Sequence, residues 1–308
     1  MFAPSTRTRL APTPSGYLHL GNLFSFVLTA GLARSTGARI LLRIDDLDQQ
    51  RVRKEYIRDV FEILDFFNIP WDEGPRNEEA FEKEYSQVHR THLYNAALNK
   101  LRSTGMIFAC ECSRSLLQQA ATAGCPGSCL DKNIPLEKPG VNWRLRTNNL
   151  PITIQDHSGR SHTCAFPASM RDFIIRKKDG QAAYQLASVC DDMYFGVNLI
   201  VRGEDLMDSS LAQLYLASLL PEPHFQEHAF CHHRLLTGAD AIKLSKSAGA
   251  GSIYYLRKTG KTRAEILTLL LHQLGVPGTA ETWEELAAIL LADTALWLSC
   301  DPQSGLSG

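Results

Sequence analysis

The order of the predicted strands and helices places this chain in the α/β class, with a parallel sheet that carries helices on its faces. A strand over 9–11 leads into a turn and an apolar helix, an apolar strand follows over 38–44, and a helical pattern runs from Tyr56 to Phe67. Strand–helix–strand–helix order in the first seventy residues favours a doubly wound parallel sheet. The 308 residues, of which 44% are hydrophobic, can bury the core of one large domain with insertions or of two domains.

The first strand ends at a turn cluster, Pro12-Thr13-Pro14-Ser15-Gly16, which cannot be helical. The helix after it is apolar from Leu23 to Leu32 and is expected to end near Gly37, because glycine is common just past a helix C-terminus. The short apolar run over 38–44 is expected to form a central parallel strand.

The middle of the chain interrupts this rhythm. A helix is predicted over 89–101, and the segment 110–165 then holds a cysteine cluster and two alternating, strand-like stretches. We interpret this segment as an insertion between two halves of a nucleotide-binding fold. The pattern then resumes, with strands predicted over 173–175 and 198–202 and helices over 183–189 and 211–220.

The C-terminal part is predicted to be helical. Thr262 with Glu265, and Thr282 with Glu285, both match the spacing of a capping box. The last eight residues are expected to be frayed.

Composition and charge exclude several classes of protein. The sequence is neither collagen-like nor wholly disordered, and apolar runs such as 266–271 and 287–292 are too short to span a bilayer. The N-terminus lacks the apolar segment of a secretory signal, so a cytoplasmic location is expected. Between His232 and Arg263 stand seven Lys or Arg residues and one acidic residue, Asp240. Such a stretch suits phosphate binding or an ordinary solvated surface, and charge alone does not decide between them.

The first motif with chemical meaning is His19-Leu20-Gly21-Asn22, at the start of a helix. A helix N-terminus offers N–H groups and the positive end of its dipole to a phosphate. Gly21 would let a flat adenine lie against the backbone, and His19 could donate to a phosphate oxygen. Taken alone, the motif is weak, and a histidine that caps the helix is the favoured interpretation.

The second motif is Ile242-Lys243-Leu244-Ser245-Lys246-Ser247, with glycines on both sides. Such a loop could close on a triphosphate and stabilise the charge that develops during transfer, although a solvated basic loop is the simpler alternative. The sequence Gly260-Lys261-Thr262 is no P-loop, because Tyr255 stands where that motif needs glycine; it predicts a helix start with a Thr cap.

Together the two motifs resemble the signature pair of the class I aminoacyl-tRNA synthetases, which stand here as HLGN and KLSKS. The string RLAPTPSGYLHLGN from Arg9 onward is similar to the glutamyl branch, as are the stretches 43–48, 183–187 with 191–192, and 200–206. The resemblance extends from about residue 7 to about residue 275.

This resemblance implies a Rossmann-like, doubly wound parallel sheet with an inserted zinc-containing, acceptor-type subdomain and a short helical C-terminal region. We expect the halves of the nucleotide-binding domain at 1–105 and 171–235, the zinc-binding insertion at 106–170, and the KLSKS loop with the C-terminal helices at 236–308.

Four of the eight cysteines fall within twenty residues, as Cys110, Cys112, Cys125 and Cys129. Closely spaced pairs in a cytosolic protein are more often metal ligands than disulfides, and four thiolates suit tetrahedral Zn²⁺ in a structural role. The spacing resembles the zinc knob of glutamyl-type synthetases; the alternative is four free buried thiols. The remaining cysteines are interpreted as ordinary thiols: Cys164, Cys190, Cys231 and Cys300.

The resemblance also implies the site residues. Catalysis is expected to use His19, Gly21, Lys243 and Lys246, and ATP binding to use those residues with Asn22 and Ser245. The glutamate site is expected to comprise Arg9, Leu10, Ala11, Pro12, Thr13, Asp45, Tyr184 and Arg202. Arginine is the natural partner of a carboxylate. Asp45 departs from the glutamate that is usual in the family, so its contact with the substrate ammonium is expected to be longer or water-bridged.

The chain resembles the truncated, glutamyl-Q group of the branch, because only about thirty residues follow Gly275 and no anticodon-binding region fits there. This implies activation of L-glutamate by ATP with Mg²⁺ and transfer to queuosine at the wobble position of tRNA(Asp). We expect one structural Zn²⁺, no membrane partner and a monomer. The alternatives are a truncated glutamyl-tRNA synthetase-like enzyme with another acceptor, a small-molecule nucleotidyltransferase, and a non-catalytic tRNA-binding paralogue.

Overall fold

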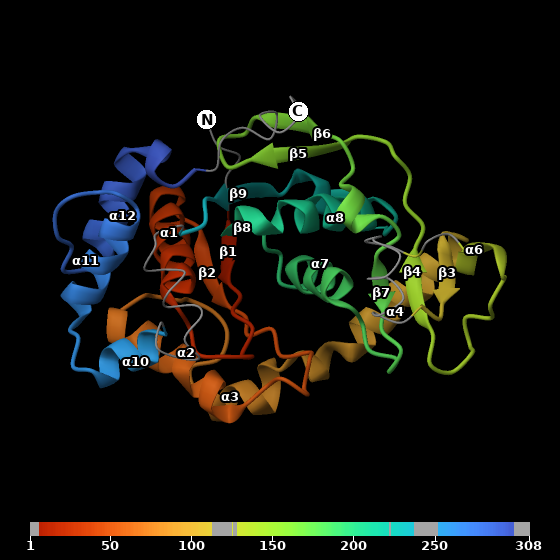
Figure 1. Cartoon of the computed structure of the whole chain (residues 1–308), viewed down its shortest axis with the longest axis horizontal. Coiled ribbons are helices and arrows are strands. Elements are labelled where there is room, and N and C mark those ends of the chain that lie inside the picture. The colour runs from red at the N-terminus through yellow and green to blue at the C-terminus, as the bar shows by residue number, and fades with distance from the viewer. Residues whose placement is uncertain (1–5, 113–124, 126–127, 222, 237–251, 299–308) are drawn as a thin grey trace. The chain divides into compact units, whose positions relative to one another are not determined.

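The computed structural model describes residues 6–112, 125, 128–221, 223–236 and 252–298. It divides into two compact units, each built from several stretches of the chain (Figure 1). The first unit comprises Met1–His89, Leu199–Asp205 and Phe230–Asp301, and the second comprises Arg90–Asn198, Leu206–Ala229 and Pro302–Gly308.

The first unit contains a sheet in the order β2-β1-β8-β9. Its strands are β1 (Arg7–Leu10), β2 (Arg39–Leu42), β8 (Leu199–Gly203) and β9 (Ala229–His233). Its helices are α1 (Leu20–Thr36), α2 (Lys54–Phe67), α3 (Glu78–Ala80), α10 (Ile253–Lys258), α11 (Arg263–Gln273) and α12 (Trp283–Ala292), with short helical turns at Phe81–Tyr85, Gln87–Arg90, Glu204–Leu206 and Thr294–Leu296. β1 is parallel to both β2 and β8, so the predicted α/β class with parallel strands is confirmed.

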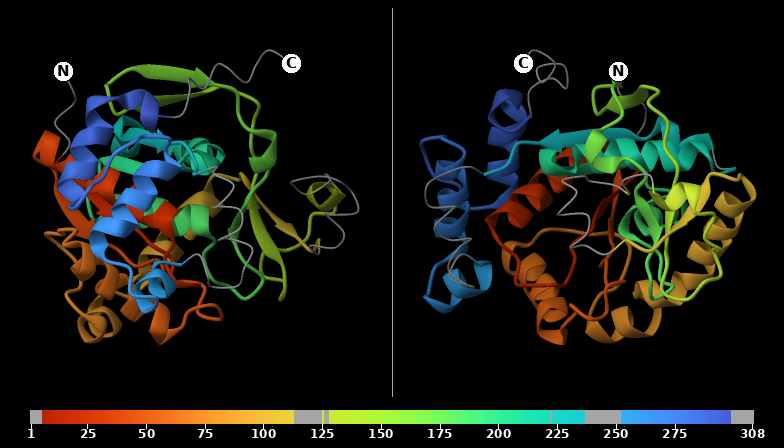
Figure 2. Two further views of the ribbon diagram at one scale, coloured as in Figure 1. Left: turned by 60° about the vertical axis from the view of Figure 1, so that its left-hand side comes forward. Right: turned by 45° about the vertical axis from the view of Figure 1, so that its right-hand side comes forward.

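Helix α1 is buried on nearly every side. It packs against β1, β2 and β8 and, on another face, against α12, which lies beside it in Figures 1 and 2. The two helices approach closely at Gly31, where a Cβ would lie 3.0 Å from the Cβ of Ala287. The helix ends at Gly37 with φ of 74°, as the sequence predicts, because glycine adopts this left-handed conformation without steric cost.

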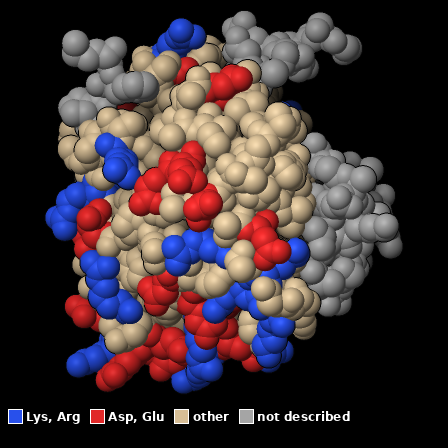
Figure 3. Space-filling view, turned by 90° about the vertical axis from the view of Figure 1, so that its left-hand side faces the viewer, with Lys and Arg blue, Asp and Glu red and all other residues tan. Residues whose placement is uncertain are grey.

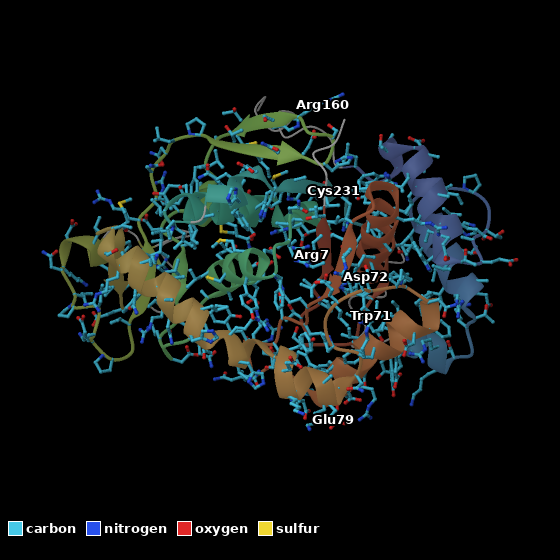
Figure 4. All side chains as sticks on the ribbon, turned by 180° about the vertical axis from the view of Figure 1, so that it is seen from behind. Arg7, Trp71, Asp72, Glu79, Arg160 and Cys231 are labelled. Carbon is cyan, nitrogen blue, oxygen red and sulfur yellow. The ribbon has the colours of Figure 1, made fainter. Side chains whose placement is uncertain are left out.

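The prediction that the strand after α1 is central is wrong. Within the described strands of the first unit, β2 lies at the edge of the sheet, although three of its residues are buried. The following segment covers that edge: Leu42 N donates to Glu73 O at 2.9 Å, and Ile40 N donates to the Asp72 carboxylate at 2.7 Å. Asp72 and Arg7 mark this place in Figure 4. An apolar run therefore indicates that both sides of the strand are buried, and it does not indicate whether the strand is central or at the edge of the sheet.

The C-terminal helices start at the predicted threonines. Thr262 and Glu265 form a complete capping box at α11. At α12, Thr282 accepts from Glu285 N, but the Glu285 carboxylate bonds to the N–H of Glu281 instead of returning to Thr282. The predicted helix is confirmed, and its capping box is only half formed.

The second unit has its own small sheet in the order β3-β4-β7, which is antiparallel, and a β5–β6 hairpin. Its strands are β3 (Ile107–Cys110), β4 (Asn142–Leu145), β5 (Ile152–Asp156), β6 (Ser161–Cys164) and β7 (Ile174–Arg176). Its helices are α4 (Thr91–Ser103), α6 (Ser128–Asp131), α7 (Tyr184–Tyr194) and α8 (Met207–Ser218), with short turns at Ala168–Met170 and Pro223–Glu227. The strand predicted at 173–175 exists, but it pairs with β4 of the small sheet and does not resume the parallel one.

A buried ion pair ties α4 to α7 inside this unit. Both oxygens of Asp191, which is fully buried, accept from the Arg90 guanidinium, at 2.8 and 3.0 Å. The hydroxyl of Tyr94 donates to the same carboxylate at 2.8 Å. The bidentate hydrogen bonds between Arg90 and Asp191 offset the cost of burying both charges, which a buried ion pair requires.

Two predictions fall outside the described residues: the KLSKS segment and the frayed end of the chain. Within the residues that the structure does describe, no helix is long and apolar enough to cross a membrane.

Candidate active site

His19 is the N-cap of α1. Its Nδ1 accepts from the N–H of Gly21 at 3.1 Å, and its own N–H donates to the Asn22 side chain at 3.0 Å. The first turn of α1, all of which is described, carries no acidic side chain. The helix dipole and the N–H groups at this end therefore favour an anion. The capping interpretation of His19 is correct, and it leaves the phosphate interpretation open.

Gly21 leaves room for the folded-back imidazole. A Cβ at this position would lie 2.9 Å from Cε1 and 3.0 Å from Nδ1 of His19. Any larger residue would displace the ring. The spacing His-x-Gly is thus a geometric requirement of the cap itself, beyond the flat approach of adenine that the sequence suggests.

The cap fixes which His19 nitrogen can donate. Since Nδ1 accepts a hydrogen bond, the neutral ring carries its proton on Nε2. Desolvation by the surrounding protein lowers the pKa of His19, which favours this neutral form, although part of the ring is open to solvent. Nε2–H is then a donor held at the positive end of a helix.

The residues that follow the KLSKS segment pair with this turn. Ser252 forms an isolated antiparallel bridge with His19, and Ile253 N donates to Leu18 O at 2.8 Å. Lys243, Ser245 and Lys246 lie outside the described residues. The described end of their segment is therefore joined to the HLGN motif, more than two hundred residues away in the chain.

Most of the residues predicted to bind the substrate glutamate lie at or near the carboxyl ends of β1, β2 and β8. Arg9 is buried in β1 and donates to Val201 O at 3.2 Å, and Asp45 N bonds to Pro12 O at 2.9 Å. Leu10 and Pro12 are buried, whereas Ala11 is half-buried and Thr13 is exposed. Arg202 lies buried near the end of β8. Ligands of open α/β sheets bind at this edge.

Asp45 is engaged by a neighbour that the sequence analysis did not consider. Both of its carboxylate oxygens accept from the Arg43 guanidinium, at 2.7 and 3.0 Å, and both side chains are buried. The pair is neutral as a whole, so an incoming ammonium would share the carboxylate with Arg43. Asp46 has a structural role, since it accepts from Ser86 Oγ at 2.5 Å and Gln87 N at 2.7 Å.

Arg202 lies against the buried aromatic ring of Phe230. Its guanidinium lies 5.5 Å from the centre of the Phe230 ring, which is parallel to the imidazole of His232. Burial, with the positive charge of Arg202 next in importance, lowers the pKa of His232 to about 3. His232 is therefore uncharged near neutral pH and adds no second positive charge beside Arg202.

Tyr184 belongs to the second unit, at the start of α7, and 44% of its side chain is exposed. The next residue, Gln185, is held by Ser209 and Gln213 of α8. An exposed tyrosine on a well-anchored helix is free to contact a ligand.

The four clustered cysteines meet in the second unit. Their sulfur atoms all lie within 4.8 Å of one another, with Cys112 Sγ 4.0 Å from Cys125 Sγ and 3.6 Å from Cys129 Sγ. Four sulfurs around a tetrahedral Zn²⁺ at about 2.3 Å would be about 3.8 Å apart, so the donor set fits that ion. Burial raises the pKa of the Cys112 thiol, and a bound cation would be needed to offset the cost of its thiolate. Phe108, Leu130 and Ile134 pack around the cluster.

Two cations of the basic stretch pair with acidic side chains in the described part of the fold. Arg257 pairs with Glu62 at 3.3 Å, and Lys261 approaches Glu265 at 3.8 Å. Figure 3, which faces α10, α11 and α12, shows Lys and Arg interspersed with Asp and Glu. Among the residues that the structure describes, this face is a mixed surface and not a continuous basic patch.

Asp59, which the sequence analysis missed, contacts the HLGN turn. It lies on α2, is buried, and accepts from Leu18 N at 2.9 Å. A signal was present: Asp59 stands between Tyr56 and Ile63 at helical spacing, so a carboxylate occupies the apolar face of this helix.

The chain is similar in sequence to known proteins. The sequence profile described as "tRNA synthetases class I (E and Q), catalytic domain" matches residues 5–130 and 146–288. A protein of Nocardia farcinica named "Glutamyl-Q tRNA(Asp) synthetase" is 36% identical over 283 residues, which are 87% of this chain and 85% of that protein. A protein of Acidithiobacillus ferrooxidans named "Glutamate--tRNA ligase 2" is 34% identical over 281 residues, 86% of this chain and 57% of that protein.

The solved structures show the same fold. The glutamate-tRNA synthetase of Elizabethkingia anophelis superposes with a TM-score of 0.65 at 20% identity, over 83% of this chain and 54% of that one. This chain thus spans about half the length of that structure. The chain therefore belongs to the class I tRNA synthetase family for glutamate and glutamine, a family of α/β ligases, and groups within it with the glutamyl-Q tRNA(Asp) synthetases.

Proposed function

We propose that this protein activates L-glutamate with ATP and transfers it to queuosine at the wobble position of tRNA(Asp). The observation that carries the proposal is the junction of the HLGN turn with the residues that follow the KLSKS segment, at the carboxyl edge of a parallel sheet. Relatives named for this activity are similar to the chain over 85–90% of their own length in the cases of Nocardia farcinica and Neisseria meningitidis. We place the reaction in the cytoplasm, where its substrates would be found.

ATP, with Mg²⁺, would dock at the N-terminus of α1. The neutral His19 would donate from Nε2 to a phosphate oxygen, Gly21 would let the adenine lie against the backbone, and Asn22 would complete this end of the ATP site. Lys243, Ser245 and Lys246 would offset the charge that grows on the α-phosphate as the glutamate α-carboxylate attacks it. Pyrophosphate leaves, and glutamyl-adenylate remains.

Glutamate would lie over the strand ends described above. Arg9 and Arg202 supply buried cations for its side-chain carboxylate, and the stretch Leu10–Thr13 would line the site. The α-ammonium would contact Asp45, which shares its charge with Arg43, and Tyr184 would be a further residue that binds the substrate. A hydroxyl of the cyclopentene ring of queuosine would then attack the adenylate carbonyl, which forms an ester and breaks the bond to the phosphate, so that AMP leaves.

The cysteine cluster would hold one Zn²⁺ through Cys110, Cys112, Cys125 and Cys129. Four protein ligands leave no open position, so the ion would be structural. It would fasten the end of β3 to α6, which supply Cys110 and Cys129, respectively.

Glutamate-dependent exchange of ATP with labelled pyrophosphate tests the activation step. We expect exchange with the wild-type protein and its collapse in Lys246→Ala with an unchanged circular dichroism spectrum. Absence of exchange with glutamate would contradict the proposal and favour a binding paralogue or another nucleotidyltransferase. A second candidate acceptor, the 3′ end of a tRNA, follows from the relatives named glutamate–tRNA ligase; comparison of queuosine-containing with unmodified tRNA(Asp) decides between the two.

A further inference from the structure

We propose that Asp59 is a positioning residue for the nucleotide site: it holds the Leu18–His19 turn from one side while Ser252 and Ile253 hold it from the other. This inference rests on the proposed function for its catalytic consequence. The geometry itself is independent of that function.

The first contact comes from α2. Asp59 Oδ2 accepts the N–H of Leu18 at 2.9 Å, and Leu18 immediately precedes the N-cap His19. Leu18 and Asp59 are both buried. This hydrogen bond is the direct contact between the helix and the backbone that orients the imidazole.

The opposite side of the same residue is also held. The carbonyl of Leu18 accepts from Ile253 N at 2.8 Å, and His19 forms a β-bridge with Ser252. Ser252 in turn caps α10. The two faces of one peptide segment are thus bonded to α2 and to the residues that follow KLSKS.

Aromatic packing reinforces this junction. Tyr17 stacks on Tyr254 with ring centres 4.2 Å apart and 9° between the planes, and the edge of Tyr56 from α2 meets Tyr17 at 5.0 Å. Lys258 lies over the Tyr254 ring at 5.0 Å. The stack of Tyr17 on Tyr254 therefore joins the segment before α1 to the start of α10.

A carboxylate at this position is costly, which argues for a specific role. Asp59 Oδ1 is buried and has no hydrogen-bond partner among the described residues. The charged side chains that act on Asp59 are Arg257 of α10, which pairs with Glu62, and Glu62 of α2 itself; Tyr17 and His19 lie on the turn it holds. Burial raises the pKa of Asp59 to about 6. An apolar residue would avoid this cost, but it could not hold the Leu18 N–H.

The consequence is a link between the two signature motifs. If Asp59 releases Leu18, the cap at His19 loses its orientation and the bridge to Ser252 loses one side of its support. We expect binding of ATP to weaken, because the donor at Nε2 is no longer held in place, while binding of glutamate at the strand ends is unaffected.

The test uses two variants and a matched control. Asp59→Asn keeps an acceptor for Leu18 N and removes the charge, and Asp59→Ala removes both. The control is Asp72→Asn, because Asp72 also accepts a backbone N–H, that of Ile40 at 2.7 Å, but at the edge of β2. The first readout is the NMR signal of the Leu18 backbone N–H, which Asp59 accepts, followed from pH 5 to 8 in all four proteins. The second readout is the KM for ATP and for glutamate in pyrophosphate exchange.

We expect the Leu18 N–H signal of the wild type to shift with an inflection near pH 6, because Asp59 accepts this N–H, and we expect Asp59→Asn to remove the inflection and Asp72→Asn to retain it. We expect Asp59→Ala to raise the KM for ATP about tenfold, the loss of one hydrogen bond to a charged group, without changing the KM for glutamate. Asp59→Asn should restore most of the ATP affinity.

A Leu18 N–H inflection of unchanged size in Asp59→Asn would overturn the proposal, as would equal changes in both KM values. If Asp59→Ala does not fold, the comparison of the wild type with Asp59→Asn still decides. If the wild type shows no exchange, the proposed function fails, whereas the NMR titration continues to test the positioning role.

Discussion

Substitution of Gly21 by Ala adds one methyl group at a place where its contacts are defined. The new Cβ would lie 2.9 and 3.0 Å from two atoms of the His19 ring. Carbon atoms in contact prefer about 3.5–4.0 Å, so the ring has to move by about half an ångström or more. Its Nδ1 then loses the 3.1 Å hydrogen bond from residue 21, and Nε2 changes direction.

The expected magnitudes separate folding from function. Loss of an N-cap lowers the free energy of unfolding by about 1 kcal/mol, whereas replacement of glycine by alanine inside a helix raises it by about the same amount. The stability of Gly21→Ala should therefore change little. Loss of the hydrogen bond from His19 to a phosphate should cost about 1.5–3 kcal/mol, which corresponds to a decrease of about 10- to 150-fold in kcat/KM for ATP.

The assay is pyrophosphate exchange with Tm measured on the same samples, and Gly31→Ala is the matched control. Gly31 lies in the same helix, and a Cβ there would meet Ala287 at 3.0 Å, far along α1 from the cap. We expect Gly31→Ala to lower Tm and to keep its exchange rate per folded molecule. Normal exchange by Gly21→Ala would refute the assigned role of the cap.

The remaining predictions concern charge, metal and substrate. The pKa of Asp59 is raised from 3.8 to about 6, so between these pH values the folded protein retains a proton that the unfolded chain has lost. The contribution of Asp59 to the free energy of unfolding therefore falls as the pH rises from about 4 to about 6, by an amount on the order of 3 kcal/mol. Urea unfolding at the two pH values should show this decrease, and Asp59→Asn should remove it. Cys125→Ser should reduce zinc content, measured by mass spectrometry, from one ion per chain to none. Asp191→Asn should destabilise the protein by about 3–5 kcal/mol in urea, because it leaves buried Arg90 without its counter-charge; a loss below 1 kcal/mol would contradict this. Arg202→Lys should raise the KM for glutamate at least about tenfold and leave that for ATP unchanged.

Features with a local cause were predictable from the sequence. The start and end of α1 follow from a capping residue and a glycine, and the cysteine cluster follows from paired spacing, since each pair needs only a short turn. The α/β class follows from the order of the elements because parallel strands require crossover helices.

Features set by distant partners were not predictable in this way. The edge position of β2 depends on the chain at 72–73, and the pairing of β7 with β4 depends on strand partners that hydrophobic pattern does not specify. The contact of Asp59 with Leu18 joins residues 41 positions apart. The sequence predicts the negative charge of Asp45. The two hydrogen bonds that Arg43 donates to its carboxylate oxygens depend on side-chain geometry, which the sequence does not show.

The most direct test of the whole account is transfer of labelled glutamate, with ATP, to tRNA(Asp) that contains queuosine and to the same tRNA without it. After nuclease digestion, we predict the label in the anticodon fragment of the modified tRNA alone. Label at the 3′-terminal nucleotide, or equal labelling of both tRNAs, would contradict the account.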